Sequence, residues 1–268
     1  MGNSCCTESN TNPNLEVSGT LRKVKYEVIP EQTRGIQEHP VTFQDVENFN
    51  RGPTDFFTLN DKIINLIAKH PVSNLKQHDK TVPFKKVTVR GVSSRDYQFF
   101  GQMQNGQREG VGMIYFLDKG TSGTPVNEHY HPMQIPAGGE FVAAKFKNDM
   151  LDGPVLVYTP DGSYFEGTYS LGQPAKGKIL FSNGDLYEGP FKEGKFHGRG
   201  QLTFADGRKY VGEFSKGSLE GFGRLTFPTK SWYEGNWKGS ILYGKCSRRN
   251  NHGLIEDLDL KIQEALTT

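Results

Sequence analysis

The strongest constraint on this fold is a phrase of about 23 residues that recurs, with small variations, through the second half of the chain. In its three best copies, an aromatic residue opens the phrase and a second aromatic residue follows four positions later. These residues are Tyr187, Phe191, Tyr210, Phe214, Tyr233 and Trp237. A fixed period indicates an array of similar units rather than one globule around a single buried active site.

The array extends towards the N-terminus through weaker copies that begin at Phe165, Val142 and Phe99. The step from Phe99 to Val142 holds one period plus an insert, residues 117–139, whose role stays open. We therefore count six copies within residues 86–247, the sixth truncated after Gly244.

Each copy has the pattern of a β-hairpin. Two short alternating runs are joined by a turn such as Glu193-Gly194-Lys195, and copies are joined by turns such as Asp206-Gly207. Asp-Gly is a strong hairpin signal because glycine accepts positive φ without a Cβ clash. The sequence predicts a mainly β fold, an elongated antiparallel meander of hairpins with short helical segments at both ends.

Glycines recur inside the predicted strands, where they normally weaken pairing. They are Gly189, Gly198, Gly200, Gly212, Gly221 and Gly223. Their recurrence indicates a bend or a close backbone approach in every hairpin. If φ is positive at Gly198 or Gly221, a substitution there costs about 1 kcal/mol or more. An unchanged melting temperature for Gly198→Val would contradict this.

The six aromatic residues of the best copies allow two interpretations. They either form a hydrophobic core or shape an exposed binding surface, and only side-chain orientation decides between the two.

The phrase Tyr187-Glu188-Gly189, followed by Gly194-Lys195 and His197-Gly198, resembles the MORN (membrane occupation and recognition nexus) repeat family over roughly residues 97–246. The resemblance implies a twisted hairpin array that acts as a scaffold or adaptor, often near membranes, in cilia or in the cortical cytoskeleton. Family members that are enzymes carry a separate catalytic domain, and no segment here fits one. We therefore expect no enzymatic activity, no catalytic residue and no cofactor.

The N-terminus begins Met1-Gly2-Asn3-Ser4-Cys5-Cys6, which looks like an N-myristoylation signal on Gly2. The match is imperfect, since Cys6 stands where the motif has Ser or Thr. Cys5 and Cys6 are candidate palmitoylation sites, and a second acyl chain is what stable anchoring needs. The alternative is an ordinary N-terminus that happens to begin with Met-Gly. Acylation predicts a place on the cytoplasmic face of a plasma or ciliary membrane.

Composition excludes several other classes of protein. No apolar run is long enough for a transmembrane helix, and the first 30 residues lack a secretory signal. Three cysteines form no disulfide framework. A net charge of +2 argues neither for nor against a nucleic-acid partner, but no basic stripe stands out, and we expect no such partner.

The flanking segments are predicted to differ from the array. Residues 1–40 resemble a flexible tether, and residues 41–85 a small helical cap with a helix over 61–70 that turns Ile63, Ile64 and Ile67 to one face. Residues 84–92 alternate like a strand, and 248–268 contain an amphipathic helix over 254–266. These helices either cap the open ends of the array or dock a partner.

No motif predicts a metal or catalytic site. Glu128-His129-Tyr130-His131 lacks further ligands at metal-binding spacing, and His197 is a turn or packing residue. Cys246 is expected to be a packed thiol. Asp residues that recur beside glycine are turn residues, namely Asp161, Asp185 and Asp206.

The sequence therefore predicts a non-enzymatic, membrane-tethered scaffold that binds a protein partner. An anionic lipid surface and a second copy of the chain stay open as further partners. One alternative is a structural subunit of a ciliary, axonemal or cortical cytoskeletal assembly. The other is a phosphoinositide-binding regulatory subunit of an enzyme.

Overall fold

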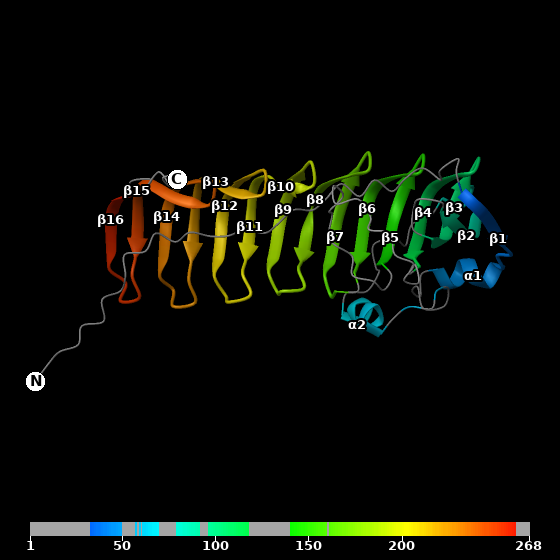
Figure 1. Ribbon diagram of the computed structural model, residues 1–268, viewed down its shortest axis with the longest axis horizontal. Helices are drawn as coiled ribbons and strands as arrows, with labels where there is room; N and C mark the ends of the chain where they lie inside the picture. Colours follow the sequence, from blue (N-terminus) through cyan, green and yellow to red (C-terminus); the bar gives the residue numbers. More distant parts are fainter. Residues whose placement is uncertain are drawn as a thin grey trace, which may run out of the picture.

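The computed structural model describes residues 33–49, 57, 59, 61–69, 79–91, 96–117, 140–159 and 161–260. The lipidation candidates Gly2, Cys5 and Cys6, and the motif at 128–131, lie outside these residues. The strands form one 16-stranded antiparallel sheet in which chain neighbours are also sheet neighbours, and Figure 1 shows them side by side along the long axis. The strands are β1 (Thr33–His39), β2 (Phe84–Gly91), β3 (Tyr97–Gln104), β4 (Gln107–Phe116), β5 (Glu140–Lys147), β6 (Met150–Tyr158), β7 (Tyr164–Ser170), β8 (Gln173–Leu180), β9 (Leu186–Lys192), β10 (Lys195–Phe196), β11 (Gly198–Thr203), β12 (Lys209–Ser215), β13 (Ser218–Thr226), β14 (Trp232–Lys238), β15 (Ile241–Arg249) and β16 (Ile255–Leu260).

The six predicted copies are six hairpins, which confirms the predicted meander. They are β3–β4, β5–β6, β7–β8, β9 with β10 and β11, β12–β13, and β14–β15. Consecutive hairpins pair as well, so the sheet is continuous from β1 to β16.

All six hairpins close through a two-residue turn with positive φ at both positions, as in Glu193 (φ 54) and Gly194 (φ 73). This is the type I′ geometry that matches the twist of the strands. The second position is glycine in four hairpins and a hydrogen-bonding residue in two, Asp149 and Ser240. The Ser240 hydroxyl accepts a hydrogen bond from the amide of Leu219 on the preceding hairpin, at 3.1 Å.

The turns between hairpins share another geometry. In the predicted Asp206-Gly207 turn, the amide of Gly207 donates to the carbonyl of Phe204. The amide of Phe204 donates in turn to the carbonyl of Arg208. The residue with positive φ is Gly162, Gly184, Gly207, Lys230 or Gly253, depending on the turn. Lys230 (φ 68) is the member of this set that carries a side chain.

We expect Lys230→Gly to raise the free energy of unfolding by about 0.5–1 kcal/mol, because glycine adopts this backbone conformation without steric strain. Lys230 is exposed, so no packing is lost. Urea unfolding of the variant measures the gain. Lys230→Ala removes the same side chain but keeps the strain, so an equal gain for Lys230→Ala would contradict the explanation.

The strands bend near their turn ends, where register shifts interrupt the pairing, for example between Gly212 and Glu213. Gly198 and Gly221 lie at these bends and both have φ of 62°, the condition under which the sequence predicts a cost for any side chain. In Figure 1 the bent ends of the hairpins lie across the upper edge of the sheet. Side chains from these ends, namely Phe196, Leu219 and Leu242, are buried in the same cluster as Tyr187 and Tyr210, so one face of the sheet packs against its own hairpin ends.

Other strand glycines are required because an aromatic ring occupies the space in which a Cβ atom would lie. Gly212 and Gly223 face each other across β12 and β13, and the ring of Tyr210 lies over both. A Cβ on Gly223 would lie 2.5 Å from the Tyr210 Cζ, and one on Gly200 would lie 2.9 Å from Cε2 of Tyr187. Real Cβ atoms do not approach so closely, so each hairpin of this type needs its glycines where the ring lies.

The second hairpin solves the same packing problem without a ring. Its first position is Val142, and Ala144 and Val155 face each other where the other copies have glycines. All three side chains are buried. A smaller first residue leaves room for the Cβ atoms, which explains why this copy is hard to recognise in the sequence.

The helices of the described chain are α1 (Phe43–Asn48) and α2 (Asp61–Lys69), both at the N-terminal end of the array (Figure 1). The sequence predicts α2, but as a cap of the open end or a docking helix, whereas Ile63 of α2 packs on a face of the sheet, in a cluster with Phe100 and Met113. Phe49 follows α1 and its ring contacts Phe84, with centroids 5.0 Å apart. In α2, Ile63 is fully buried and Ile67 is partly buried against the same cluster, whereas Ile64 is exposed, so the prediction that all three isoleucines share one face is wrong for Ile64.

Both ends of the array extend further than predicted. Residues 33–39, assigned to the tether, form β1, which pairs with β2 and adds a strand to the sheet. Residues 255–260, assigned to a C-terminal helix, form β16, which pairs with β15. The helical spacing of apolar residues was misleading, because the unpaired edge of β15 supplies backbone partners and Leu258 and Leu260 pack against the sheet core. Thus the helical segments of the described chain lie at the N-terminal end only.

Candidate interaction surface

The six predicted aromatic residues lie in the sheet core rather than on an exposed surface. Tyr187, Phe191, Tyr210, Phe214 and Trp237 are buried, and Tyr233 is half-buried. The sequence leaves open whether these residues form a core or an exposed binding surface. For the five buried residues, the structure shows that they form a core.

The first ring of one copy packs against the second ring of the next copy. Tyr187 contacts Phe214 with centroids 5.2 Å apart, and Tyr210 contacts Trp237 at 5.5 Å. The pairs Phe99–Phe146 and Phe165–Phe191 repeat the contact at 5.8 Å each. Edge-to-face contacts of this kind contribute about 0.5–1.5 kcal/mol each beyond the area they bury. This aromatic ladder joins consecutive hairpins.

The polar atoms of the ladder side chains form hydrogen bonds with backbone carbonyls near the hairpin bends. The Tyr187 hydroxyl donates to the carbonyl of Pro190 at 2.8 Å, and the Tyr210 hydroxyl donates to that of Glu213 at 3.1 Å. Burial raises the pKa of both phenols. The Trp237 indole donates to the carbonyl of Gly223 at 3.0 Å. These groups hold the hairpin bends.

One cross-strand row shows how the opposite face changes character along the sheet. It begins with the buried residues Phe100, Met113, Ala143 and Leu156, which contribute to the core cluster that includes Ile63 of α2. Beyond β6 the same row continues as Glu166, Lys178, Glu188, Gln201, Val211, Arg224, Glu234, Ser247 and Asp257. The helices therefore cover the apolar half of this face.

We call the charged continuation over β8–β16 the open face: it comprises the row from Lys178 to Asp257 and the side chains flanking it on the same side. Its largest exposed apolar side chain is Phe222, which is 58% exposed, and Val211 is also exposed. Singly exposed apolar residues are common on protein surfaces, so what sets this face apart is that the described helices leave it uncovered. The open face is thus the candidate interaction surface.

Three neighbouring side chains on the open face, Arg224, Trp232 and Glu234, contact one another. The Arg224 guanidinium lies over the Trp232 ring, 4.4 Å from its centroid, and its Nε donates to a Glu234 carboxylate oxygen at 2.7 Å. Planar stacking and a charge-assisted hydrogen bond fix this arginine in one place.

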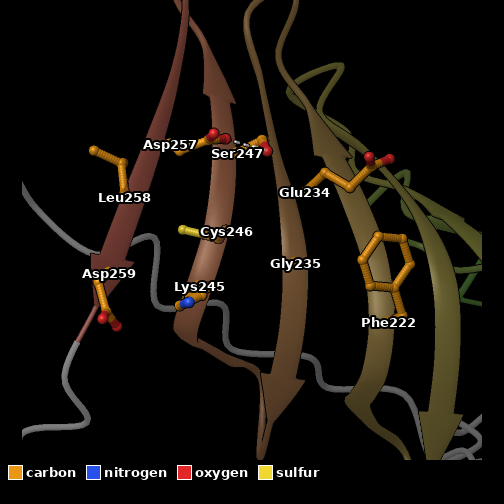
Figure 2. A pocket seen from close by; sticks show the side chains of 9 residues that line it. All are labelled: Phe222, Glu234, Gly235, Lys245, Cys246, Ser247, Asp257, Leu258 and Asp259. Atoms are coloured by element: carbon orange, nitrogen blue, oxygen red, sulfur yellow. Dashed lines mark hydrogen bonds between the residues drawn. The ribbon is translucent and has the colours of Figure 1, made fainter.

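A hollow of about 530 Å³ lies beside Phe222 at the C-terminal end of the open face. Figure 2 shows Phe222 and Glu234 on one side of it and Asp257 and Asp259 on the other. The stretch between them is formed by Gly235 and by Lys245, Cys246 and Ser247 of β15. The volume is within the range of sites that take a side chain or small ligand.

The residues that the sequence assigns to turns are found in turns. The amide of Ser163 donates to Asp161 and that of Arg208 to Asp206, at 2.9 and 3.0 Å, while Asp185 accepts from the amide of Ala205 at 2.9 Å. His197 donates its amide to the carbonyl of Pro190 at the hairpin bend. Cys246 is buried, and burial raises the pKa of its thiol.

Within the part of the chain that the structure describes, no group of His, Cys, Asp and Glu side chains is arranged to hold a metal ion. None of the helices found there is long and apolar enough to cross a membrane.

Comparison with known proteins identifies the repeat but not a relative. No curated protein matches the chain. The family model described as MORN repeat matches residues 99–121, 187–207 and 210–232, which lie in the first, fourth and fifth hairpins. The chain therefore contains three MORN repeats recognisable by sequence, within an array of six hairpins.

Proposed function

We propose that the protein is a non-enzymatic scaffold that binds a protein partner on its open face. The observation that carries the proposal is the half-covered face of the sheet: the chain's own helices occupy the apolar half and leave the half with Phe222 and Val211 exposed. MORN repeats are commonly associated with scaffolding and with protein–membrane contact, which agrees with this role.

The scaffold is tethered to the cytoplasmic face of a membrane through acylation at Gly2, Cys5 and Cys6. The support is the sequence of the first residues, because a glycine exposed after Met1 removal and two adjacent cysteines supply the two acyl signals that stable anchoring needs.

Partner binding is tested by proximity labelling in cells with wild type and with Arg199→Glu/Val211→Asp, which alters the open face on β11 and β12. Both side chains are exposed, so the fold is expected to persist, and circular dichroism checks this. The proposal expects a set of proteins labelled by wild type and lost with the variant. The same labelled proteins for both would overturn the assignment of the open face.

We expect Gly2→Ala to move the protein from the membrane fraction to the soluble fraction of a eukaryotic cell, because myristoylation requires the N-terminal glycine. Intact mass of the N-terminal peptide measures the modification directly, and Asn3→Ala is the matched control that keeps Gly2. Equal partition of wild type and Gly2→Ala with an unmodified peptide would exclude the tether. The protein would then be sought in a detergent-insoluble cytoskeletal assembly.

A further inference from the structure

The contact between the third and fourth hairpins differs from the other contacts between consecutive hairpins of the array. The six hairpins meet at five such contacts, which we call joints, and each joint pairs the second strand of one hairpin with the first strand of the next. The joint between β8 and β9 is the third of the five, so it lies in the middle of the array (Figure 1).

The backbone pairing of this joint is shorter than that of the others. Each of the other four joints ends, near the hairpin bends, in a pair that contains a glycine with positive φ. The third hairpin is one residue shorter at its bend, so Ala175 stands at the position of this glycine. The pairing of β8 with β9 therefore stops at Lys176 and Pro190, one pair earlier than in the other joints. The pairs that close the other joints are Gly110–Phe146, Gly153–Tyr169, Gly198–Phe214 and Gly221–Trp237.

The hydrogen bond between hairpin tips is also missing at this joint. In the other four joints, an amide in the tip of the later hairpin donates to a backbone carbonyl of the earlier hairpin, as Gly217 does to Phe196 at 3.0 Å. The equivalent amide at the third joint is that of Gly194, which forms no hydrogen bond with the residues that the structure describes. The other three bonds join Asp149 to Arg108, Gly172 to Leu151 and Ser240 to Leu219.

A polar atom is left over beside the short bend. The side-chain oxygen Oε1 of Gln173 is buried, and it accepts no hydrogen bond from the described chain. A buried acceptor of this kind disfavours the closed arrangement, because it can bond to water once the hairpin ends separate.

The sheet face opposite the ladder does not brace the joint either. The apolar cluster that includes Ile63 of α2 extends as far as Leu180 of β8, and its described members include none from the last three hairpins. The joint is held by its five remaining backbone pairs and by the ladder contact of Phe165 with Phe191 at 5.8 Å.

We infer that this joint is a hinge, at which the bent ends of the third and fourth hairpins separate while the turn that connects β8 to β9 acts as the pivot. The array then flexes as two blocks. One block consists of the first three hairpins with the helices, and the other consists of the last three hairpins with most of the open face. The hinge is a property of the chain alone, so it is independent of the proposed partner.

Amide hydrogen exchange of the full chain, measured at single residues by mass spectrometry, tests the hinge. Gly177 and Gly189 still pair at this joint, and Gly200 and Gly212 are the equivalent pair at the next joint. A uniform array opens from its ends, so without a hinge the middle joint is at least as well protected as its neighbours. We expect protection factors about tenfold lower for Gly177 and Gly189 than for Gly200 and Gly212. Equal or higher protection of Gly177 and Gly189 would overturn the inference.

A repaired hairpin gives the second test. Insertion of a histidine after Pro174, together with Ala175→Gly, gives the third hairpin the length and the bend glycine of the fourth. We expect the protection of Gly189 to rise about tenfold, to the level of Gly212, because the missing pair and the missing tip bond can then form. Circular dichroism checks that the variant folds.

The matched control places the same extra histidine after Asn183, in the turn that connects the two hairpins. It lengthens the chain equally but leaves the bend of the third hairpin short, so the protection of Gly189 should not rise. If both insertions raise it equally, or if the repaired chain folds and leaves Gly189 unchanged, the short bend does not create a hinge. If the repaired chain does not fold, the comparison of the two joints in wild type still decides the question.

Discussion

Asp149→Gly should lower the free energy of unfolding by about 3 kcal/mol or more, although glycine is the residue that four other hairpins have at this position. Asp149 pairs with Arg108, with Oδ1 and Nε 2.9 Å apart, and both side chains are almost completely buried. The same oxygen accepts the Arg108 amide at 2.8 Å. Glycine would relieve the positive φ of Asp149 but leave a buried guanidinium without its carboxylate.

The other hairpins indicate a second substitution that should restore stability to Asp149→Gly. At the position equivalent to Arg108, other hairpins have apolar residues such as Leu151 and Leu219, both fully buried. Arg108→Leu added to Asp149→Gly recreates that arrangement, and we expect stability within about 1 kcal/mol of wild type. A double-mutant cycle by urea unfolding then gives a coupling energy of about 2–3 kcal/mol.

The exposed pair Lys85–Glu38 is the matched control for this cycle. Its atoms are 3.0 Å apart, but the side chains are 44% and 64% exposed. Glu38→Gln should change stability by less than about 0.5 kcal/mol, since water screens such pairs. If Asp149→Gly has an effect as small as that of Glu38→Gln, the buried ion pair does not hold the first two hairpins together.

The regular parts of this fold could be predicted because each hairpin uses the same local chemistry. The period from Tyr187 to Tyr233 defines equal units, and Glu193-Gly194 and Asp206-Gly207 mark the turns with residues that accept positive φ. Hairpins, their order and their antiparallel pairing follow from these local signals alone.

The ends of the sheet could not be predicted in the same way, because their strands depend on an edge that the array creates. One further step of 23 residues from Tyr233 reaches Glu256, the second residue of β16. That position lacks the aromatic residue, and the spacing of Leu254 and Leu258 favours a helix. The free edge of β15 decided the outcome, and it is visible only once the array is assembled.

The candidate site was missed for a related reason. Phe222 stands in a copy whose repeat residues all match, so it appears to be one more aromatic residue of the array. A signal existed, because Arg199 and Lys245 occupy the same position in adjacent copies. Which side of the sheet these residues occupy depends on the bend at Gly221, and which half of that side is covered depends on the helices.

Gly223→Val should lower the free energy of unfolding by about 3 kcal/mol or more, because the added Cβ would overlap the ring of Tyr210. The ring cannot move aside freely: it lies edge-to-face with Trp237 at 5.5 Å, and its hydroxyl is bonded to the Glu213 carbonyl. The variant should lose both the ladder contact between the fifth and sixth hairpins and the bend that this hydroxyl holds. Hydrogen exchange at β13 and β14 measures the local opening.

The second hairpin shows how the cost can be removed. There Val142 replaces the ring, and Val155 occupies the position equivalent to Gly223. Tyr210→Val alone leaves a cavity and costs about 3 kcal/mol. In Tyr210→Val/Gly223→Val the new valine fills part of that cavity, so we expect the double variant to be no less stable than Tyr210→Val. A loss equal to the sum of the single variants would contradict the steric explanation.

Gly162→Ala separates steric overlap from backbone strain. Gly162 has φ of 96°, and a Cβ there would meet no atom within 4 Å. Its substitution should cost about 1 kcal/mol through backbone strain alone. Gly223 has no positive φ, so its larger cost must come from the ring. Equal losses for Gly162→Ala and Gly223→Val would mean that the strand glycines serve backbone flexibility, and that the rings over them do not determine where the array requires glycine.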